Sequence, residues 1–176
     1  MTHTHYEFLS GIGLDVHAFS PKNNSKNQII LLCGIPISHF ASIMAHSDGD
    51  VGLHAITDAI LGAIGAGDIG EHFPPQDAKW KNKDSVHFVQ YALQLCHEKN
   101  ANLVNVDITI ICEKPNMRAH KKAMQENIAH LLCLPMTRVN IKATTTEKLG
   151  FLGRKEGIAV LAIVSIKIPL LEPCKS

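Results

Sequence analysis

The stretch GIAVLAIVSIKI, residues 157–168, is the part of the sequence that decides the fold. It is apolar at nearly every position, and only Ser165 and Lys167 interrupt it. A strand with one face in water alternates apolar and polar residues, whereas a nearly continuous apolar run is typical of a strand buried on both faces. We therefore predict a strand here with both of its faces covered.

The spacing of apolar residues in the rest of the chain predicts further strands and helices. Strands are predicted over residues 8–19, 29–37, 103–112 and 138–144, and the first two are expected to form a hairpin. Helices are predicted to begin at Ser47 or Asp48, at Asp84 or Ser85, and near Met117, whereas residues 68–83 are predicted to be an exposed loop. This order indicates an α+β fold, a single sheet with helices packed on one face, of ferredoxin-like or split βαβ type.

The strand over residues 103–112 has one polar face, formed by Asn105, Asp107 and Thr109. Its other face is apolar, so the polar face needs a partner of its own. A subunit interface is one candidate, because a ring of identical sheets can turn polar residues into a central channel.

Composition narrows the class of protein. We expect one domain over residues 1–176, with frayed tails at 1–10 and 169–176. The net charge of +1 and the lack of a basic tract give no reason to expect nucleic acid as a partner, and the longest apolar run is too short to span a membrane. Five cysteines without a C-x-x-C pair predict free thiols, and the N-terminus does not resemble a signal peptide, so we expect a cytoplasmic protein.

Asp15, His17 and His54 are candidates for a metal site. Asp15 and His17 are two residues apart, which places both side chains on one face of a strand, and His54 lies in the first turns of a predicted helix. One carboxylate and two imidazoles suit a zinc-like ion with an open coordination position. Asp50 and Asp58 lie four residues either side of His54, and Asp58 is expected to accept its second ring N–H. The alternative is a chance grouping in a chain with 11 His, with both carboxylates as solvated helix charges.

Two loops also carry candidate chemistry. The segment GAGDIG (65–70) matches G-x-G-x-x-G, but a helical pattern precedes it, so its glycines are expected to end that helix and present Asp68. The segment TTTEK (144–148) follows a predicted strand and offers hydroxyls, a carboxylate and an ammonium group. Such a set suits a phosphate with its own divalent ion, although a Thr-rich strand ending in a helix cap is the alternative.

Together these segments resemble the 2-C-methyl-D-erythritol 2,4-cyclodiphosphate synthase family of the non-mevalonate isoprenoid pathway. The matching segments are DVHAF (15–19), AHSDGD (45–50) with His54, TDA (57–59), GDIG (67–70) with FP (73–74), NVD (105–107), ATTTEKLGF (143–151), GR (153–154) and EGIA (156–159). They occur in the family's order and cover nearly the whole chain after residue 10.

The resemblance implies a homotrimer with active sites between subunits and a central cavity that can hold an isoprenyl phosphate. The reaction it implies is the conversion of 4-diphosphocytidyl-2-C-methyl-D-erythritol 2-phosphate to the 2,4-cyclodiphosphate with release of CMP. Asp15, His17 and His54 match the zinc ligands, and Glu147 matches the ligand of a second ion, magnesium or manganese. His46 and Thr145 match the residues that stabilise the transition state.

The remaining substrate contacts follow from the same resemblance. Asp68, Ile69 and Gly70 match the methylerythritol contacts, and Phe151 and Arg154 match residues near the phosphates and the central cavity. Further expected contacts are Ser47, Phe73, Asp77, Cys112, Pro115, Asn116, Met117, Arg118, Thr144 and Thr146, together with the metal ligands Asp15, His17 and Glu147.

The cytidine-side loop departs from the family pattern Pro-Lys-x-x-Pro-His. This chain has PNMRAH over residues 115–120, so Asn116 replaces the Lys and Ala119 replaces the second Pro. Arg118 and Lys114 are the candidates to supply the missing charge. Two other hypotheses stay open, a non-catalytic trimeric module that binds zinc and a zinc-dependent hydrolase. The TTTEK segment argues against the first, and the absence of H-E-x-x-H argues against the second.

Overall fold

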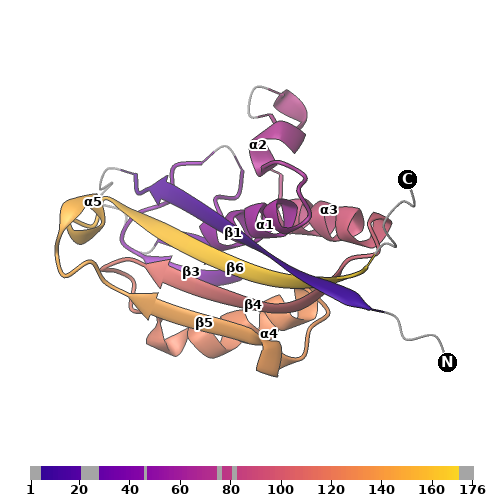
Figure 1. Cartoon of the computed structure of the whole chain (residues 1–176). Coiled ribbons are helices and arrows are strands. Elements are labelled where there is room, and N and C mark those ends of the chain that lie inside the picture. The colour runs from indigo at the N-terminus through magenta and orange to yellow at the C-terminus, as the bar shows by residue number, and fades with distance from the viewer. Residues whose placement is uncertain (1–4, 21–27, 46, 75–76, 81–82, 171–176) are drawn as a thin grey trace.

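The computed structural model describes residues 5–20, 28–45, 47–74, 77–80 and 83–170. A four-stranded sheet forms its centre, with the strand order β1-β6-β4-β5 (Figure 1). The strands are β1 (Tyr6–Ala18), β6 (Gly157–Pro169), β4 (Asn102–Ile111) and β5 (Val139–Thr144). β6 is antiparallel to both β1 and β4, and β4 is parallel to β5.

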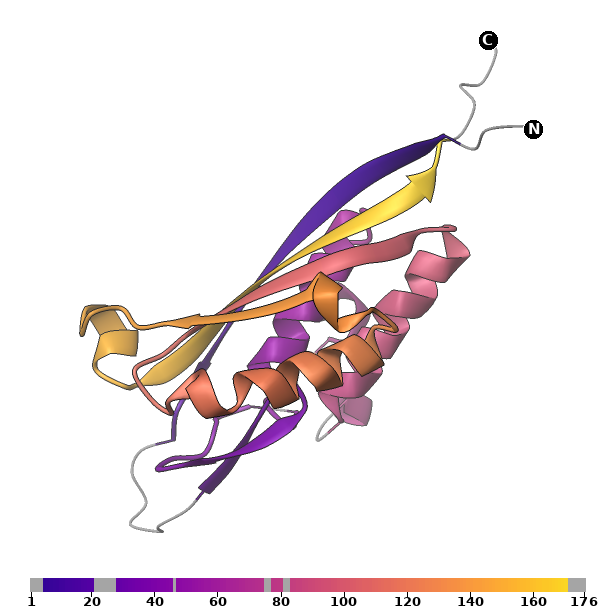
Figure 2. The same ribbon diagram turned by 90° about the horizontal axis from the view of Figure 1, so that it is seen from below.

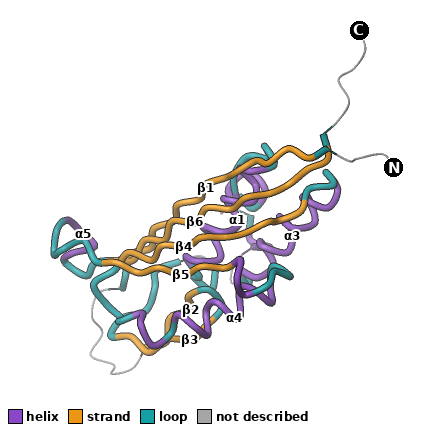
Figure 3. Tube along the Cα trace, turned by 60° about the horizontal axis from the view of Figure 1, so that its bottom comes forward, coloured by secondary structure: helices purple, strands orange, loops and turns teal. Residues whose placement is uncertain are grey.

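Three helices cover one face of this sheet, and the other face is open (Figures 2 and 3). They are α1 (Val51–Ala63), α3 (Ser85–Glu98) and α4 (Lys121–Leu131). α4 lies in the connection between the parallel strands β4 and β5, which need a crossover of this kind. The short helices are α2 (Ile69–His72), α5 (Gly150–Gly153), η1 (Ala78–Trp80), η2 (Met117–Ala119) and η3 (Met136–Arg138).

The core lies between the sheet and these helices. Val106, Ile108 and Ile110 of β4 are buried on the helix-facing side, as their alternation predicts. Full burial of such an aliphatic side chain contributes about 1.5–3 kcal/mol. On the opposite side, Asp107 accepts hydrogen bonds from Asn140 at 2.9 Å and from Lys142 at 2.5 Å, so the polar stripe continues onto β5.

β1 and α1 approach each other very closely. A Cβ atom on Gly13 would overlap the carbonyl oxygen of Ala55, and one on Gly11 would overlap that of Ala59. Only glycine allows a helix backbone so near the strand. Because side chains alternate along a strand, Asp15 and His17 lie on this same helix-facing side of β1.

The predicted hairpin between the first two strands is wrong. β1 pairs with β6, whereas the segment predicted as one strand over residues 29–37 is divided into β2 (Gln28–Leu32) and β3 (Ile35–His39). These two pair with each other in a separate two-stranded sheet, so the fold is not built on a single sheet. Cys33 and Gly34 form the turn, with φ of 52° and 77°.

Three further predictions need correction. Ile163 is 39% exposed, so β6 is covered on only one face within this chain. β1 begins at Tyr6, which pairs with Pro169, so the described ends of the two strands are not frayed. Residues 68–83 contain α2 and η1 rather than only exposed loop, because Phe73 is buried among aromatic rings.

The start of α1 also differs from the prediction. Its N-cap is Asp50, not Ser47 or Asp48, and the Asp50 carboxylate accepts hydrogen bonds from the backbone of Leu53, Cys33 and Gly34. Asp50 is therefore a fully buried structural group rather than a solvated charge. None of the helices among the described residues is long and apolar enough to cross a membrane.

Candidate active site

Asp15, His17 and His54 form the cluster that the sequence predicts. β1 supplies the first two, and α1 supplies the third. Oδ2 of Asp15 lies 3.2 Å from Nε2 of His17 and 3.0 Å from Nδ1 of His54. One ligand atom from each of the three lies within 4.8 Å of the others, which forms a possible metal site.

The donor set fits a tetrahedral divalent ion. Bonds of about 2.0 Å to such an ion place its ligands about 3.3 Å apart, close to the 3.2 and 3.0 Å from Oδ2 of Asp15 to the nitrogens of His17 and His54. The side chains of Asp15, His17 and His54 are 24%, 15% and 12% exposed, so the cluster is largely buried but open to a small ligand. Three protein donors leave one coordination position for that ligand.

The ring nitrogens that point away from the cluster have partners of their own. Nδ1 of His17 lies 3.2 Å from the carbonyl oxygen of Gly49, and Nε2 of His54 lies 2.9 Å from Oγ of Ser85 and 3.2 Å from Oγ of Ser47. The prediction that Asp58 accepts from His54 is wrong. The Asp58 carboxylate instead accepts the backbone N–H of Ile69 at 2.7 Å.

The surroundings of Asp15 and Asp58 shift the pKa values of these two carboxyl groups in opposite directions. Burial raises the pKa of Asp15, but the hydrogen bond with His54 and the charges of His17 and His54 outweigh burial and hold this pKa below its ordinary value. Burial raises the pKa of Asp58, and the carboxylates of Asp68 and Asp15 raise it further, against the lowering effect of the Ile69 N–H. Asp15 is thus kept anionic, the form that binds a cation.

α2 carries the segment predicted to contact methylerythritol. Asp68 is its N-cap and accepts from Glu71 N at 3.0 Å, while the Ile69 N–H bond to Asp58 ties the segment to α1. Gly65, with φ of 63°, follows Ile64, the C-cap of α1, so a glycine of this segment ends the helix as predicted. Asp68, Ile69 and Gly70 therefore form the start of a short helix. This helix is held to α1 at Asp58, one helical turn after His54.

Two other predicted contacts beside α2 have evident structural partners. Phe73 is only 7% exposed and packs on the rings of Trp80, Phe88 and Tyr91. Asp77 forms an ion pair with Lys79 at 3.0 Å, and this pair lowers the pKa of Asp77. Their contacts with a substrate stay predictions.

The TTTEK segment forms a tight turn after β5. Glu147 and Lys148 have φ of 52° and 66°, and Oγ1 of Thr145 donates to Oε1 of Glu147 at 3.0 Å. The carboxylate of Glu113 accepts the backbone N–H groups of both Thr146 and Lys148 at 3.2 Å. Thr144, Thr145 and Glu147 are exposed, so their side chains are available to a ligand.

The cytidine-side loop begins directly after Glu113. The Lys114–Pro115 peptide bond is cis, and Asn116 caps η2 by accepting from Arg118 N at 2.9 Å. Met117 is buried, whereas Arg118 is exposed. Cys112 N donates to Thr144 O at 3.1 Å, so this loop and the TTTEK turn are joined at their bases.

Three remaining predictions concern residues outside these loops. Phe151 lies on α5 and is 45% exposed, and Arg154 makes two hydrogen bonds to the carboxylate of Glu156 at 2.8 and 3.0 Å. His46 lies outside the described residues.

The Asp15, His17 and His54 cluster and the start of the TTTEK turn lie at the same end of the sheet's strands, but on opposite edge strands and on opposite faces. The register places Val16, Ala159, Ile111 and Thr144 in one row across the four strands. Neighbouring strands are about 4.8 Å apart, so β1 and β5 are about 14 Å apart at this row. Asp15 and His17 face α1, whereas Thr144 is exposed beyond a strand whose buried residues face the helices.

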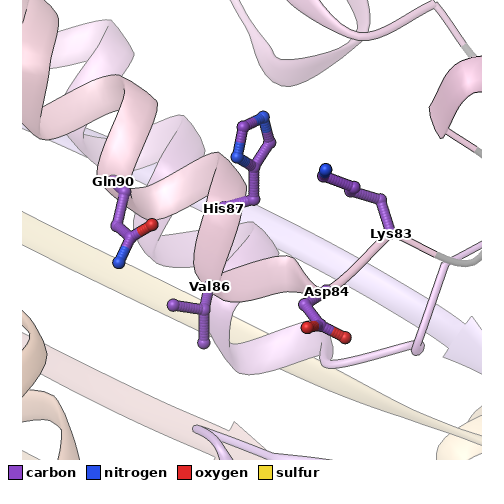
Figure 4. A pocket seen from close by; sticks show the side chains of 5 residues that line it. All are labelled: Lys83, Asp84, Val86, His87 and Gln90. Carbon is purple, nitrogen blue, oxygen red and sulfur yellow. The ribbon is translucent and has the colours of Figure 1, made fainter.

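The sequence patterns do not predict that Ser85 contacts His54 or that Glu113 accepts hydrogen bonds from the TTTEK turn. A pocket of about 290 Å³ lies beside the first turns of α3, lined by Lys83, Asp84, Val86, His87 and Gln90 (Figure 4). Ser85 belongs to the same turn but is fully buried and contacts His54 instead. Only its place at a predicted helix start marked Ser85 in the sequence, and no local pattern relates it to His54.

Comparison with known proteins places these features in a family. The model of the YgbB family matches residues 8–167. The chain is 56% identical over 158 residues to the 2-C-methyl-D-erythritol 2,4-cyclodiphosphate synthase of Ehrlichia chaffeensis, which covers 89% of this chain and 91% of that protein. It is 50% identical over 159 residues to the bifunctional enzyme IspD/IspF of Caulobacter vibrioides, covering 90% of this chain but only 40% of that relative.

A solved structure supports the same relationship. The structure of IspF from Plasmodium falciparum in complex with CDP superposes with a TM-score of 0.78 at 34% identity, covering 93% of this chain and 97% of that one. The α+β architecture described above is therefore shared with that protein.

Proposed function

The chain belongs to the YgbB family, and we propose that it converts 4-diphosphocytidyl-2-C-methyl-D-erythritol 2-phosphate to 2-C-methyl-D-erythritol 2,4-cyclodiphosphate and CMP. The observation that carries this proposal is the Asp15, His17 and His54 cluster at the positions that the family resemblance assigns to a metal. The CDP complex of the Plasmodium falciparum relative supports a cytidine nucleotide as the ligand type.

In this reaction an oxygen of the 2-phosphate attacks the β-phosphorus. The bond from that phosphorus to the bridging oxygen breaks, and CMP leaves with the electron pair. Nucleophile and electrophile belong to one molecule, so the protein needs no nucleophile of its own and acts by orienting and neutralising phosphates. The buried thiol of Cys112 agrees with this, because burial raises its pKa to about 11.

We propose that the TTTEK turn and the cytidine-side loop bind different parts of the substrate. We infer that the hydroxyls of Thr144 and Thr145 and the ammonium group of Lys148 donate to phosphate oxygens. Backbone groups of residues 112–117 would read the cytosine, and α2 would hold the methylerythritol. Zinc on Asp15, His17 and His54, and magnesium or manganese on Glu147, would neutralise phosphate charge and hold the two phosphates together.

We also propose a homotrimer whose active sites lie between subunits. Within one chain, the metal cluster and the TTTEK turn are on opposite faces and about 14 Å apart across the sheet, too far to hold two adjoining phosphates. The open face of the sheet carries Phe8, Ile12, Leu14 and Ile163, which are 69%, 63%, 60% and 39% exposed. Such a patch is typical of a protein interface. A neighbouring subunit that packs against this face along β1, which is an edge strand of the sheet, would bring its own TTTEK turn around that edge toward Asp15, His17 and His54.

An isoprenyl phosphate in the central cavity of the trimer is proposed from the family resemblance. A cytoplasmic location is proposed from the five cysteines, which form no C-x-x-C pair. The polar stripe of Asn105, Asp107 and Thr109 is where we expect that cavity.

Release of CMP tests the proposed function. The purified chain, supplied with zinc and magnesium, is expected to release one CMP per substrate consumed, measured by chromatography. The His54→Ala variant removes one of three metal ligands and is expected to lose both bound zinc and turnover. No CMP release from zinc-loaded protein would instead favour a non-catalytic binding module, and full zinc in His54→Ala would show that the ligand assignment is wrong.

A further inference from the structure

We propose that Ser85 and Asp48 are positioning residues that hold His54 for metal binding through a partly buried chain of hydrogen bonds. This inference rests on the metal site of the proposed function. Oγ of Ser85 lies 2.9 Å from Nε2 of His54, and the same Oγ donates to Oδ1 of Asp48. The backbone N–H of Ser85 donates to Oδ2 of Asp48 at 3.0 Å.

The direction of each hydrogen bond follows from the metal cluster. Nδ1 of His54 faces Asp15, and with an ion bound it would present its lone pair to the ion in place of its hydrogen bond to Asp15, so that the ring proton would sit on Nε2. Nε2–H then donates to Oγ of Ser85. The hydroxyl proton of Ser85 is left to donate to the carboxylate of Asp48, which can only accept.

This chain of hydrogen bonds has the same effect on His54 as a directly bonded carboxylate has on the ligating histidine in many metal sites. An acceptor for the second ring nitrogen fixes the tautomer and the ring orientation and makes the ligating nitrogen a better donor. Here a serine hydroxyl stands between the imidazole and the carboxylate. Asp58, the carboxylate nearest in sequence on the helix face, is engaged by Ile69 N and does not take this role.

The arrangement is built by three separate segments. His54 comes from α1, Asp48 from the loop before it, and Ser85 from the start of α3, which is 31 residues from His54. Ser85 is fully buried, although its neighbours Asp84, Val86 and His87 line the pocket on the outer side of the same turn. A serine turned inward among outward-facing neighbours satisfies buried polar groups that would otherwise lack a partner.

Ser47 is the natural comparison within the site. Its Oγ lies 3.2 Å from Nε2 of His54, and it also accepts the backbone N–H of Gly49 at 3.2 Å. Its contact with His54 is longer, and among the described residues it makes no hydrogen bond to Asp48, so we expect it to contribute less than Ser85.

Zinc affinity in a double-mutant cycle tests the chain of hydrogen bonds from Asp48 through Ser85 to His54. The full-length wild type, Ser85→Ala, Asp48→Asn and the double variant are titrated against a chelator of known affinity. We expect Ser85→Ala to weaken zinc binding about 10–100-fold. Asp48→Asn is expected to weaken it by a smaller factor, because the amide oxygen can still accept from Ser85. In the Ser85→Ala background, Asp48→Asn is expected to add nothing further, because the path to His54 is already cut.

Ser42→Ala is the matched control, because it removes a hydroxyl that bonds only to Ser20 Oγ, at 2.9 Å, among the described contacts. It is expected to keep wild-type zinc affinity. The visible spectrum of the cobalt-substituted protein gives a second readout, since a reoriented His54 changes the ligand field whereas a general loss of stability does not. If Ser85→Ala does not fold, the Asp48→Asn affinity and spectrum alone decide the question against Ser42→Ala.

The outcomes separate the two levels of the proposal. A wild type that binds no zinc would contradict the metal site itself. Tight binding by the wild type with unchanged affinity in Ser85→Ala, or full additivity in the double variant, would overturn the positioning chain and leave the metal site intact.

Discussion

Nδ1 of His54 lies 3.0 Å from Oδ2 of Asp15, although 39 residues separate them in the sequence. Gly11 and Gly13 make this possible, because they allow the backbone of α1 to approach β1 where any side chain would overlap the helix. The cluster of Asp15, His17 and His54 is therefore a consequence of how one strand packs on one helix.

Gly13→Ala tests that dependence. The added methyl would meet the carbonyl oxygen of Ala55, so α1 must shift away from β1. We expect a loss of about 2–3 kcal/mol in the free energy of unfolding, or about 5–10 °C in Tm, together with weaker zinc binding. Gly62→Ala is the control, because its added methyl has only the carbonyl oxygen of Ile12 nearby, at 3.9 Å, and should raise Tm slightly. A Gly13→Ala protein with wild-type Tm and zinc affinity would refute the packing argument.

Glu147→Gln tests whether Glu147 holds the second ion independently of the zinc site. The substitution keeps the shape of the side chain, and its hydrogen bond from Thr145, but removes the charge that attracts a hard cation. We expect unchanged zinc content and a steep rise in the magnesium concentration that gives half-maximal turnover. An unchanged magnesium dependence would show that Glu147 does not hold the second ion.

Glu113 is expected to support the TTTEK turn, which we propose to bind phosphate, without binding the substrate itself. Its carboxylate accepts two backbone N–H groups of the turn, so Glu113→Ala leaves both without this partner. We expect kcat/KM to fall about tenfold or more in Glu113→Ala, with zinc content unchanged, and Glu113→Gln to recover much of it because an acceptor oxygen remains. Equal damage in the two variants would point to the charge of Glu113 rather than its hydrogen bonds.

A shared active site predicts complementation between two inactive variants. His54→Ala lacks a metal ligand, and Thr145→Ala lacks a phosphate contact on the other face of the sheet. Refolded together, the two are expected to form mixed trimers in which about one site in three has both halves intact. Each variant refolded alone is the control. A fully active monomer, or mixed trimers with no recovered turnover, would contradict the split site.

Much of the fold follows from local pattern. The alternation of β4 predicts its buried face, and the helical spacing after Asp50 and after Asp84 predicts α1 and α3. The pairing of β1 could not be predicted in this way, because an extended segment carries no local signal for which strand will neighbour it. β2 and β3 instead close on each other through a two-residue turn whose residues both adopt positive φ.

In the site, too, local spacing predicts some features, whereas contacts between distant segments cannot be predicted from it. Asp15 and His17 share a strand face by their spacing alone, and this prediction is confirmed as a cluster with His54. The partner of His54 was predicted from helix spacing as Asp58, and it is wrong because Ile69 N engages that carboxylate. Ser85 and Glu113 act across long separations in sequence, and only the packed chain brings them to the site.

Turnover in water labelled with ¹⁸O tests the central claim most directly, because only an intramolecular reaction excludes water. Phosphorus NMR of the products is expected to show two mutually coupled signals of a cyclic diphosphate beside CMP, and mass spectrometry is expected to find no ¹⁸O in either product. Linear phosphate products that carry one ¹⁸O atom would identify a hydrolase and contradict the proposed cyclisation.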